Sequence, residues 1–163
     1  MGEGDWSALI SLRTLCFLRR DNRVLLLHRR NPPNAGYWNG VGGKLEPGED
    51  PFTACVREVR EETSLTIRDP KLRVLLVATV RSTGDLWIIF VFTADAPEAA
   101  PIPSEEGDLA WVEVSQLAML PILPDLPLLL RHLGGVAVTV IRMELETEDA
   151  GSVSRVEVLG PGK

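Results

Sequence analysis

Hydrophobic residues along this chain gather in short runs that are separated by turn-forming residues. Four runs rich in Leu, Val and Ile predict β-strands, at residues 7–19, 23–30, 72–80 and 86–95. Asp21-Asn22 lies between the first two runs and predicts a tight hairpin turn. We expect a shorter strand at 109–114 and a late hairpin with strands at 136–147 and 152–159.

Apolar residues repeat at helical spacing in one segment, residues 51–63. Asp50 is placed to cap the N-terminus of this helix, and Pro51 suits its first position. The expected core-facing stripe of the helix is Phe52, Cys55, Val56 and Val59. A second, short helix is predicted at 126–133, ending at Gly134, and Ser115 is expected to cap a brief turn. Strands and helices in this order predict one α/β domain, over 1–163, with a mixed sheet.

Composition narrows the class of protein. The 163 residues are 45% hydrophobic and 25% charged, and the formal net charge is −6. Duplex nucleic acid is not an expected partner, because proteins that bind it usually carry a basic stripe. The sequence has no basic, apolar leader and no run long enough for a membrane span, so we expect a cytoplasmic protein without a membrane partner, either monomer or homodimer. Both cysteines, Cys16 and Cys55, are expected to be buried thiols.

The strongest chemical signal is a glycine-rich loop, residues 36–50, that leads into a helix rich in glutamate. Glu58, Glu61 and Glu62 are three or four residues apart and therefore share one helix face. A solvated face on which Arg57 pairs with Glu61 would explain this pattern. A site for a hard divalent cation such as Mg²⁺ or Mn²⁺ would also explain it, with phosphates held by the loop and by Lys44.

The segment from Gly43 to Leu65, "GKLEPGEDPFTACVREVREETSL", resembles the Nudix box. Eight positions are in register, namely Gly43, Glu49, Arg57, Glu58, Val59, Glu61, Glu62 and Leu65. Ser64 stands where the family pattern has a glycine that ends the helix. The resemblance implies the Nudix fold, an α/β/α sandwich around a mixed sheet, and a metal-dependent pyrophosphohydrolase.

The resemblance also implies roles for individual residues. Glu58, Glu61 and Glu62 would bind Mg²⁺ or Mn²⁺, one of them could also act as base, and Gly43 would add its carbonyl oxygen. Arg57 would orient the glutamates by pairing with Glu49, and Lys44 would lie near the phosphates.

Outside the box, the sequence is similar to the MutT-type hydrolases of oxidised purine nucleoside triphosphates, such as 8-oxo-dGTP. "WNGVGGK" and "LPDLPLLL" carry this similarity, which begins near Thr14. It implies nucleotide contacts from Asn39, Asp125, Arg29 and Thr14, and a metal contact from Glu106. Four of these five residues also have a simpler interpretation: Asn39 as a loop residue bound to local backbone, Asp125 as a helix cap, and Glu106 and Arg29 as surface charges.

Two positions depart from the MutT-type pattern. Leu123 replaces a tryptophan of the base pocket and Leu126 replaces a second aspartate. Trp38 or Trp87 could supply an aromatic wall instead, although both also suit a core. Another nucleoside diphosphate derivative, such as a dinucleoside polyphosphate, ADP-ribose or a 5′-triphosphorylated RNA, therefore stays open as substrate, and so does a nucleotide sensor without turnover.

Overall fold

The structure is a computed structural model, and it describes residues 9–149 and 153–160. Its strands are β1 Ile10–Arg20, β2 Arg23–Arg29, β3 Trp38–Asn39, β4 Lys71–Val80, β5 Asp85–Asp95, β6 Gly107–Glu113, β7 Thr139–Leu145 and β8 Val153–Gly160. Its helices are α1 Pro51–Thr63, the 3₁₀-helix η1 Val114–Met119 and α2 Leu126–Arg131. No helix of the described residues is long and apolar enough to cross a membrane.

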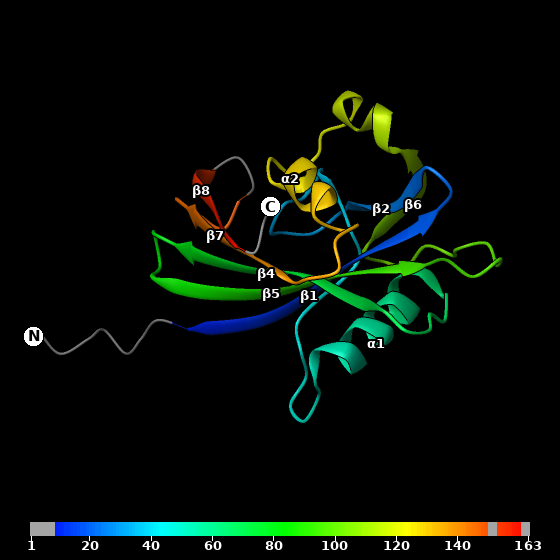
Figure 1. Cartoon of the computed structure of the whole chain (residues 1–163), viewed down its shortest axis with the longest axis horizontal. Helices are drawn as coiled ribbons and strands as arrows, with labels where there is room; N and C mark the ends of the chain where they lie inside the picture. The colour runs from blue at the N-terminus through cyan, green and yellow to red at the C-terminus, as the bar shows by residue number, and fades with distance from the viewer. Residues whose placement is uncertain (1–8, 150–152, 161–163) are drawn as a thin grey trace, which may run out of the picture.

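The strands form a mixed sheet in the order β3-β2-β1-β5-β4-β7-β8. Strand β1 runs parallel to β5, and β4 runs parallel to β7, whereas β4 and β5 are antiparallel. Strand β2 meets β1 only near their connecting turn and then pairs along its whole length with β6. The sheet therefore opens between β1 and β2, as Figure 1 shows, and the glycine-rich loop enters this opening.

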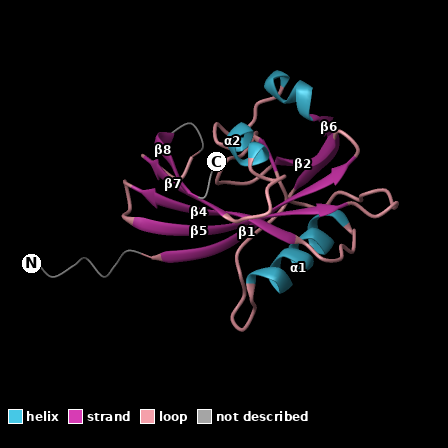
Figure 2. Cartoon of the chain, viewed as in Figure 1, coloured by secondary structure: helices cyan, strands magenta, loops and turns pink. Residues whose placement is uncertain are grey.

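Side chains of β1 alternate between two cores. Leu15 and Phe17 pack into the cluster that holds Leu129 of α2, whereas Cys16 and Leu18 pack into the cluster that holds Val59 of α1. Helices α1 and α2 consequently lie on opposite faces of the sheet, as Figure 2 shows. The predicted α/β/α sandwich around a mixed sheet is confirmed.

The ends of α1 form as the sequence predicts. Asp50 Oδ1 accepts the backbone N–H of Thr53 at 2.9 Å, and Pro51 occupies the first helical turn. Ser64 ends the helix in the left-handed conformation, with φ 62° and ψ 11°. Ser64 thus adopts the backbone geometry for which the family pattern uses glycine. Both cysteines are free and buried, as expected.

Several expected boundaries differ from the structure. Strand β1 begins at Ile10, and residues 7 and 8 of the expected strand lie outside the described residues, as do residues 150–152 of the late hairpin turn. Strand β6 begins earlier than predicted, and α2 ends earlier, at Arg131. Strand β3 was not predicted, because two residues inside a glycine-rich loop give no periodic signal.

Two single-residue expectations are wrong. Ser115 does not cap a turn, because it lies inside η1, whose N-cap is Glu113. Phe52 does not face the core fully, since 48% of it is exposed and it meets Phe92 edge-on with centroids 5.0 Å apart. Phe52 occupies the first turn of α1, where the helix has not yet reached the centre of the sheet.

Candidate active site

The glycine-rich loop lies directly against β1. Thr14 N–H donates to the carbonyl of Gly43 at 2.8 Å, and Cys16 N–H donates to the carbonyl of Val41 at 2.6 Å. A Cβ atom on Gly42 would lie 2.0 Å from the carbonyl oxygen of Thr14, and this separation is too short for any residue with a side chain. The loop therefore requires glycine at this position, because its backbone pairs with β1 in place of a further strand.

Arg57 of α1 connects this helix to the loop through several hydrogen bonds. Its Nε and one Nη bond both carboxylate oxygens of Glu49, at 2.7 and 2.8 Å. The other Nη bonds Glu58 at 2.8 Å and Glu61 at 3.1 Å, and Arg57 also donates to the Lys44 carbonyl. The bond to Glu49, followed by those to Glu58, raises the pKa of Arg57. The predicted Arg57–Glu49 pair is confirmed, and the simpler expectation of an Arg57–Glu61 pair holds as well.

Two glutamates of α1 are shielded from solvent, Glu62 almost fully and Glu58 in part. Glu62 is 4% exposed and its Oε2 accepts the N–H of Gly42 at 3.1 Å. Burial, then the charge of Glu58, raises the pKa of Glu62 to about 8. Burial also raises the pKa of Glu58, and the charge of Glu106 adds to both shifts. The three carboxylates therefore lie close enough to repel one another.

This donor set fits a divalent cation. Buried carboxylates that repel each other have a large electrostatic reason to bind Mg²⁺ or a similar ion, whose ligands are hard oxygens. Within residues 9–149 and 153–160, no group of three acidic, His or Cys side chains is already arranged to hold a metal ion. Glu61 is the member that stands apart, since its side chain is 57% exposed and is held by Arg57.

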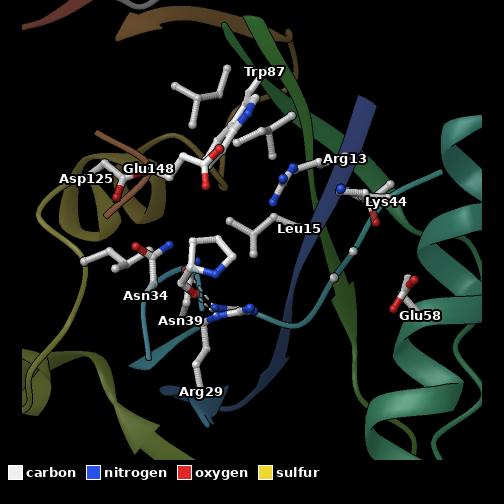
Figure 3. A pocket seen from close by; sticks show the side chains of 18 of the residues that line it. Arg13, Leu15, Arg29, Asn34, Asn39, Lys44, Glu58, Trp87, Asp125 and Glu148 are labelled. Carbon is white, nitrogen blue, oxygen red and sulfur yellow. Dashed lines mark hydrogen bonds between the residues drawn. The ribbon is translucent and has the colours of Figure 1, made fainter. Parts of the chain in front are cut away.

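A cavity of about 540 Å³ opens beside these glutamates, and Figure 3 shows its interior. Its lining includes most of the predicted site residues, namely Thr14, Arg29, Asn39, Gly43, Lys44, Glu58, Glu62, Glu106 and Asp125. Three predicted residues, Glu49, Arg57 and Glu61, do not line it. Glu49 and Arg57 reach it through Glu58 and through the backbone of Lys44.

Asn39 and Asp125 line the end of the cavity away from α1 (Figure 3). Asn39 Oδ1 accepts the N–H of Gly40 at 2.8 Å, so the local-backbone interpretation holds for its oxygen. Asp125 occupies the N-cap position of α2, but its side chain makes no capping hydrogen bond. Burial raises the pKa of the Asp125 carboxyl above its ordinary value.

Two buried oxygens at the cavity lack partners. Thr14 Oγ1 and Asn34 Oδ1 are both buried without a hydrogen bond to any described residue. Leaving such a group unsatisfied costs about 1–3 kcal/mol. Because both residues line the cavity, these oxygens are suited to a polar ligand.

Sequence reasoning missed Arg13, Asn34 and Glu148, which also line the cavity. Arg13 could have been found, since it lies two residues before Leu15 and so on the same face of β1. Glu148 could not, because the connection between β7 and β8 is distant in sequence and carries no motif. Of the two tryptophans considered for an aromatic wall, Trp87 lines the cavity, whereas Trp38 stacks on His28 at 4.6 Å.

The two departures from the MutT-type pattern occupy different places. Leu123 lines the cavity, where the pattern has a tryptophan. Leu126 is fully buried in the core beneath α2 and does not line the cavity. Of these two positions, only Leu123 faces the cavity.

Comparison with known proteins agrees with the fold and the motif. The NUDIX domain family model matches residues 11–133. The uncharacterised Nudix hydrolase YvcI of Bacillus subtilis is 36% identical over 115 residues, which cover 68% of this chain and 71% of that protein. The mouse oxidized purine nucleoside triphosphate hydrolase is 31% identical over 124 residues, covering 74% and 80%. A MutT protein structure from Bacillus halodurans has a TM-score of 0.78 at 26% identity, covering 91% of this chain and 97% of that one.

The chain therefore belongs to the Nudix family. It is a hydrolase of nucleotide derivatives, and the family works with divalent metal cations.

Proposed function

We propose that this protein hydrolyses purine nucleoside triphosphates to the nucleoside monophosphate and pyrophosphate with Mg²⁺ or Mn²⁺, and that it prefers oxidised purines such as 8-oxo-dGTP. One observation carries the proposal: a single cavity joins the buried carboxylates of α1 to Asn39 and Asp125. A nucleotide has matching parts, with phosphates that suit the first end and a base that suits the second. The similarity to the mouse hydrolase of oxidised purine nucleotides supports this choice.

At the phosphate end, Glu58, Glu62 and Glu106 would hold the divalent cation together with the carbonyl of Gly43. Glu61 would join them after its hydrogen bond to Arg57 breaks. Arg57 itself is held in place by its bidentate bond to Glu49. The bound cation would neutralise phosphate charge and lower the pKa of the attacking water. Lys44 and Arg29 line the same region and would contact phosphate oxygens.

At the base end, Asn39 and Asp125 would read the edge of the purine. The Asn39 amide still has its two N–H donors, because only its oxygen is engaged by Gly40. The Asp125 carboxyl, which makes no capping hydrogen bond, would accept from N–H groups of the base. Trp87 and Leu123 would form apolar walls for the ring, and Thr14 would use its unpaired hydroxyl on the nucleotide.

The test is a panel of nucleotides with separate detection of phosphate and pyrophosphate. We expect pyrophosphate release with a higher kcat/KM for 8-oxo-dGTP than for dGTP. Glu61→Gln should lower kcat by a factor on the order of 100 or more. Glu105→Gln is the matched control, because Glu105 is an exposed neighbour of Glu106 that does not line the cavity.

Other outcomes would redirect the proposal. Equal rates for 8-oxo-dGTP, dGTP and the pyrimidine nucleotides would exclude the preference for oxidised purines. Faster turnover of ADP-ribose or a dinucleoside polyphosphate would replace the substrate class. Absence of turnover with every substrate and metal would favour a nucleotide sensor.

A further inference from the structure

Two arginines of the cavity, Arg13 and Arg29, lie near enough to each other for their charges to interact. Both line the cavity (Figure 3). Burial lowers the pKa of Arg13, and the positive charge of Arg29 lowers it further. Within the described part of the chain, neither arginine forms an ion pair within 4.0 Å. Partly buried cations that repel each other destabilise the free protein unless an anion joins them.

Each of the two guanidinium groups is anchored by a hydrogen bond from its own Nε. Arg13 Nε donates to Ser11 Oγ at 3.0 Å, and Arg29 Nε donates to the carbonyl of Pro33 at 2.8 Å. The Arg13 guanidinium also stacks on Trp87, 4.1 Å from the ring centroid. Among the described residues, the terminal nitrogens of both arginines have no hydrogen-bond partner, so their donors remain available to a ligand.

Arg20 lies on the same strand, β1, but outside the cavity, and it provides a comparison for Arg13. It also stacks on a tryptophan, Trp111, at 4.6 Å. Its terminal Nη, however, donates to the carbonyls of Pro97 and Ala99. Stacking of an arginine on tryptophan therefore does not by itself leave the terminal donors free, and the difference at Arg13 is specific to the cavity.

We propose that Arg13 and Arg29 together form a two-guanidinium site that binds a phosphate group of the nucleotide. Arg13 is the new member of this site, whose location rests on the function proposed above. Guanidinium groups suit phosphate because their paired N–H donors match two phosphate oxygens. Arg29 lies close enough to Glu62 for its charge to lower the pKa of that carboxyl, so the site adjoins the acidic cluster. Its two positive charges would neutralise charge on the phosphate oxygens.

The charge of Glu148 also acts on Arg13. Its carboxylate lines the cavity between β7 and β8, and its charge favours the cationic form of Arg13. It does not reach ion-pair distance, so Arg13 stays free for a ligand. A phosphate bound at this site is repelled by Glu148. Removal of the Arg13 charge and removal of the Glu148 charge should therefore change phosphate affinity in opposite directions.

The test uses the full chain in EDTA and measures the binding of inorganic triphosphate by calorimetry. Arg13→Met keeps an apolar stem on Trp87 and should weaken binding by about tenfold, the usual effect of a charged hydrogen bond. Glu148→Gln should tighten binding. Arg20→Met is the matched control and should leave binding unchanged. Circular dichroism of each variant confirms that it is folded.

Two results would overturn the proposal: Arg13→Met binding triphosphate as the parent does, or Glu148→Gln binding it more weakly. These outcomes are separate from failure of the proposed function. Inorganic triphosphate has no base and is bound here without metal or turnover. A flat nucleotide panel would remove the purine preference and leave the two-guanidinium site intact, whereas an unaffected Arg13→Met would do the reverse.

Discussion

The backbone of Gly43 and the carboxylate of Glu58 approach each other so closely that no side chain fits between them. A Cβ atom at residue 43 would lie 2.6 Å from Glu58 Cδ and Oε1. The atom in its way is the end of a flexible side chain rather than backbone. The glycine therefore fixes the position of one carboxylate more than it supports the fold.

Gly43→Ala should displace the Glu58 carboxylate and lower kcat by about 100-fold, because small misplacements of catalytic groups are that costly. The melting temperature should change little, since Glu58 can move towards the cavity. Steady-state kinetics and a thermal melt measure the two effects. Gly134→Ala is the control, as a Cβ there meets nothing within 4 Å. Full activity of Gly43→Ala would show that Glu58 need not stand where the structure has it.

Helix α1 is stabilised mainly at its two ends and by one buried stripe. Asp50 caps its start, while Cys55 and Val59 are fully buried against the sheet. Its C-terminus is weaker, because Ser64 has φ 62°, a conformation in which a Cβ atom is strained. The helix thus keeps its three clustered glutamates in register although it lacks the glycine that the family pattern has at its end.

Ser64→Gly should stabilise the protein by about 1 kcal/mol, because glycine adopts this conformation without strain. Urea unfolding gives the free energy, and the nucleotide hydrolysis rate should not change. Ser115→Gly is the matched control: Ser115 is exposed inside η1 and lacks a positive φ, so glycine there should give no gain. Equal stabilisation by both changes would contradict the explanation from backbone strain.

The stability of the whole molecule should depend on pH through the acidic cluster. Glu62 has a folded pKa of about 8, raised first by burial and then by Glu58, whereas the ordinary value is 4.5. The contribution of Glu62 to stability is therefore complete below about pH 4.5. It is lost as pH rises through the folded value, because the charged form is disfavoured inside the fold.

We expect the melting temperature of the metal-free protein to fall between pH 6 and pH 9, and added Mg²⁺ to restore it more at pH 9 than at pH 6. A metal that binds the ionised carboxylates stabilises only the folded chain. Differential scanning calorimetry in EDTA and in Mg²⁺ measures this. Glu62→Gln removes the titration and should flatten the pH dependence. The same slope in both proteins would assign the effect to other groups.

Patterns within single elements were sufficient to predict much of α1. The spacing of Glu58, Glu61 and Glu62 and the cap at Asp50 depend on neighbours within one helix, so periodicity reveals them. The family motif adds the Arg57–Glu49 pair, which joins the loop to this helix. Boundaries such as the start of β6 and the strand β3 depend on a partner strand, and were therefore missed or misplaced.

Residue order alone was sufficient for the Nudix box and the residue types of the acidic cluster, because these follow from spacing along single elements. The sandwich was expected from the resemblance to the Nudix family. Residue order could not show that Arg13 of β1 and Arg29 of β2 line one cavity, or that Glu148 reaches the same cavity from the connection between β7 and β8. The glycine-rich loop enters the sheet where the sheet opens between β1 and β2. Burial there raises the pKa of Glu62 to about 8, since only packing removes water from a carboxylate.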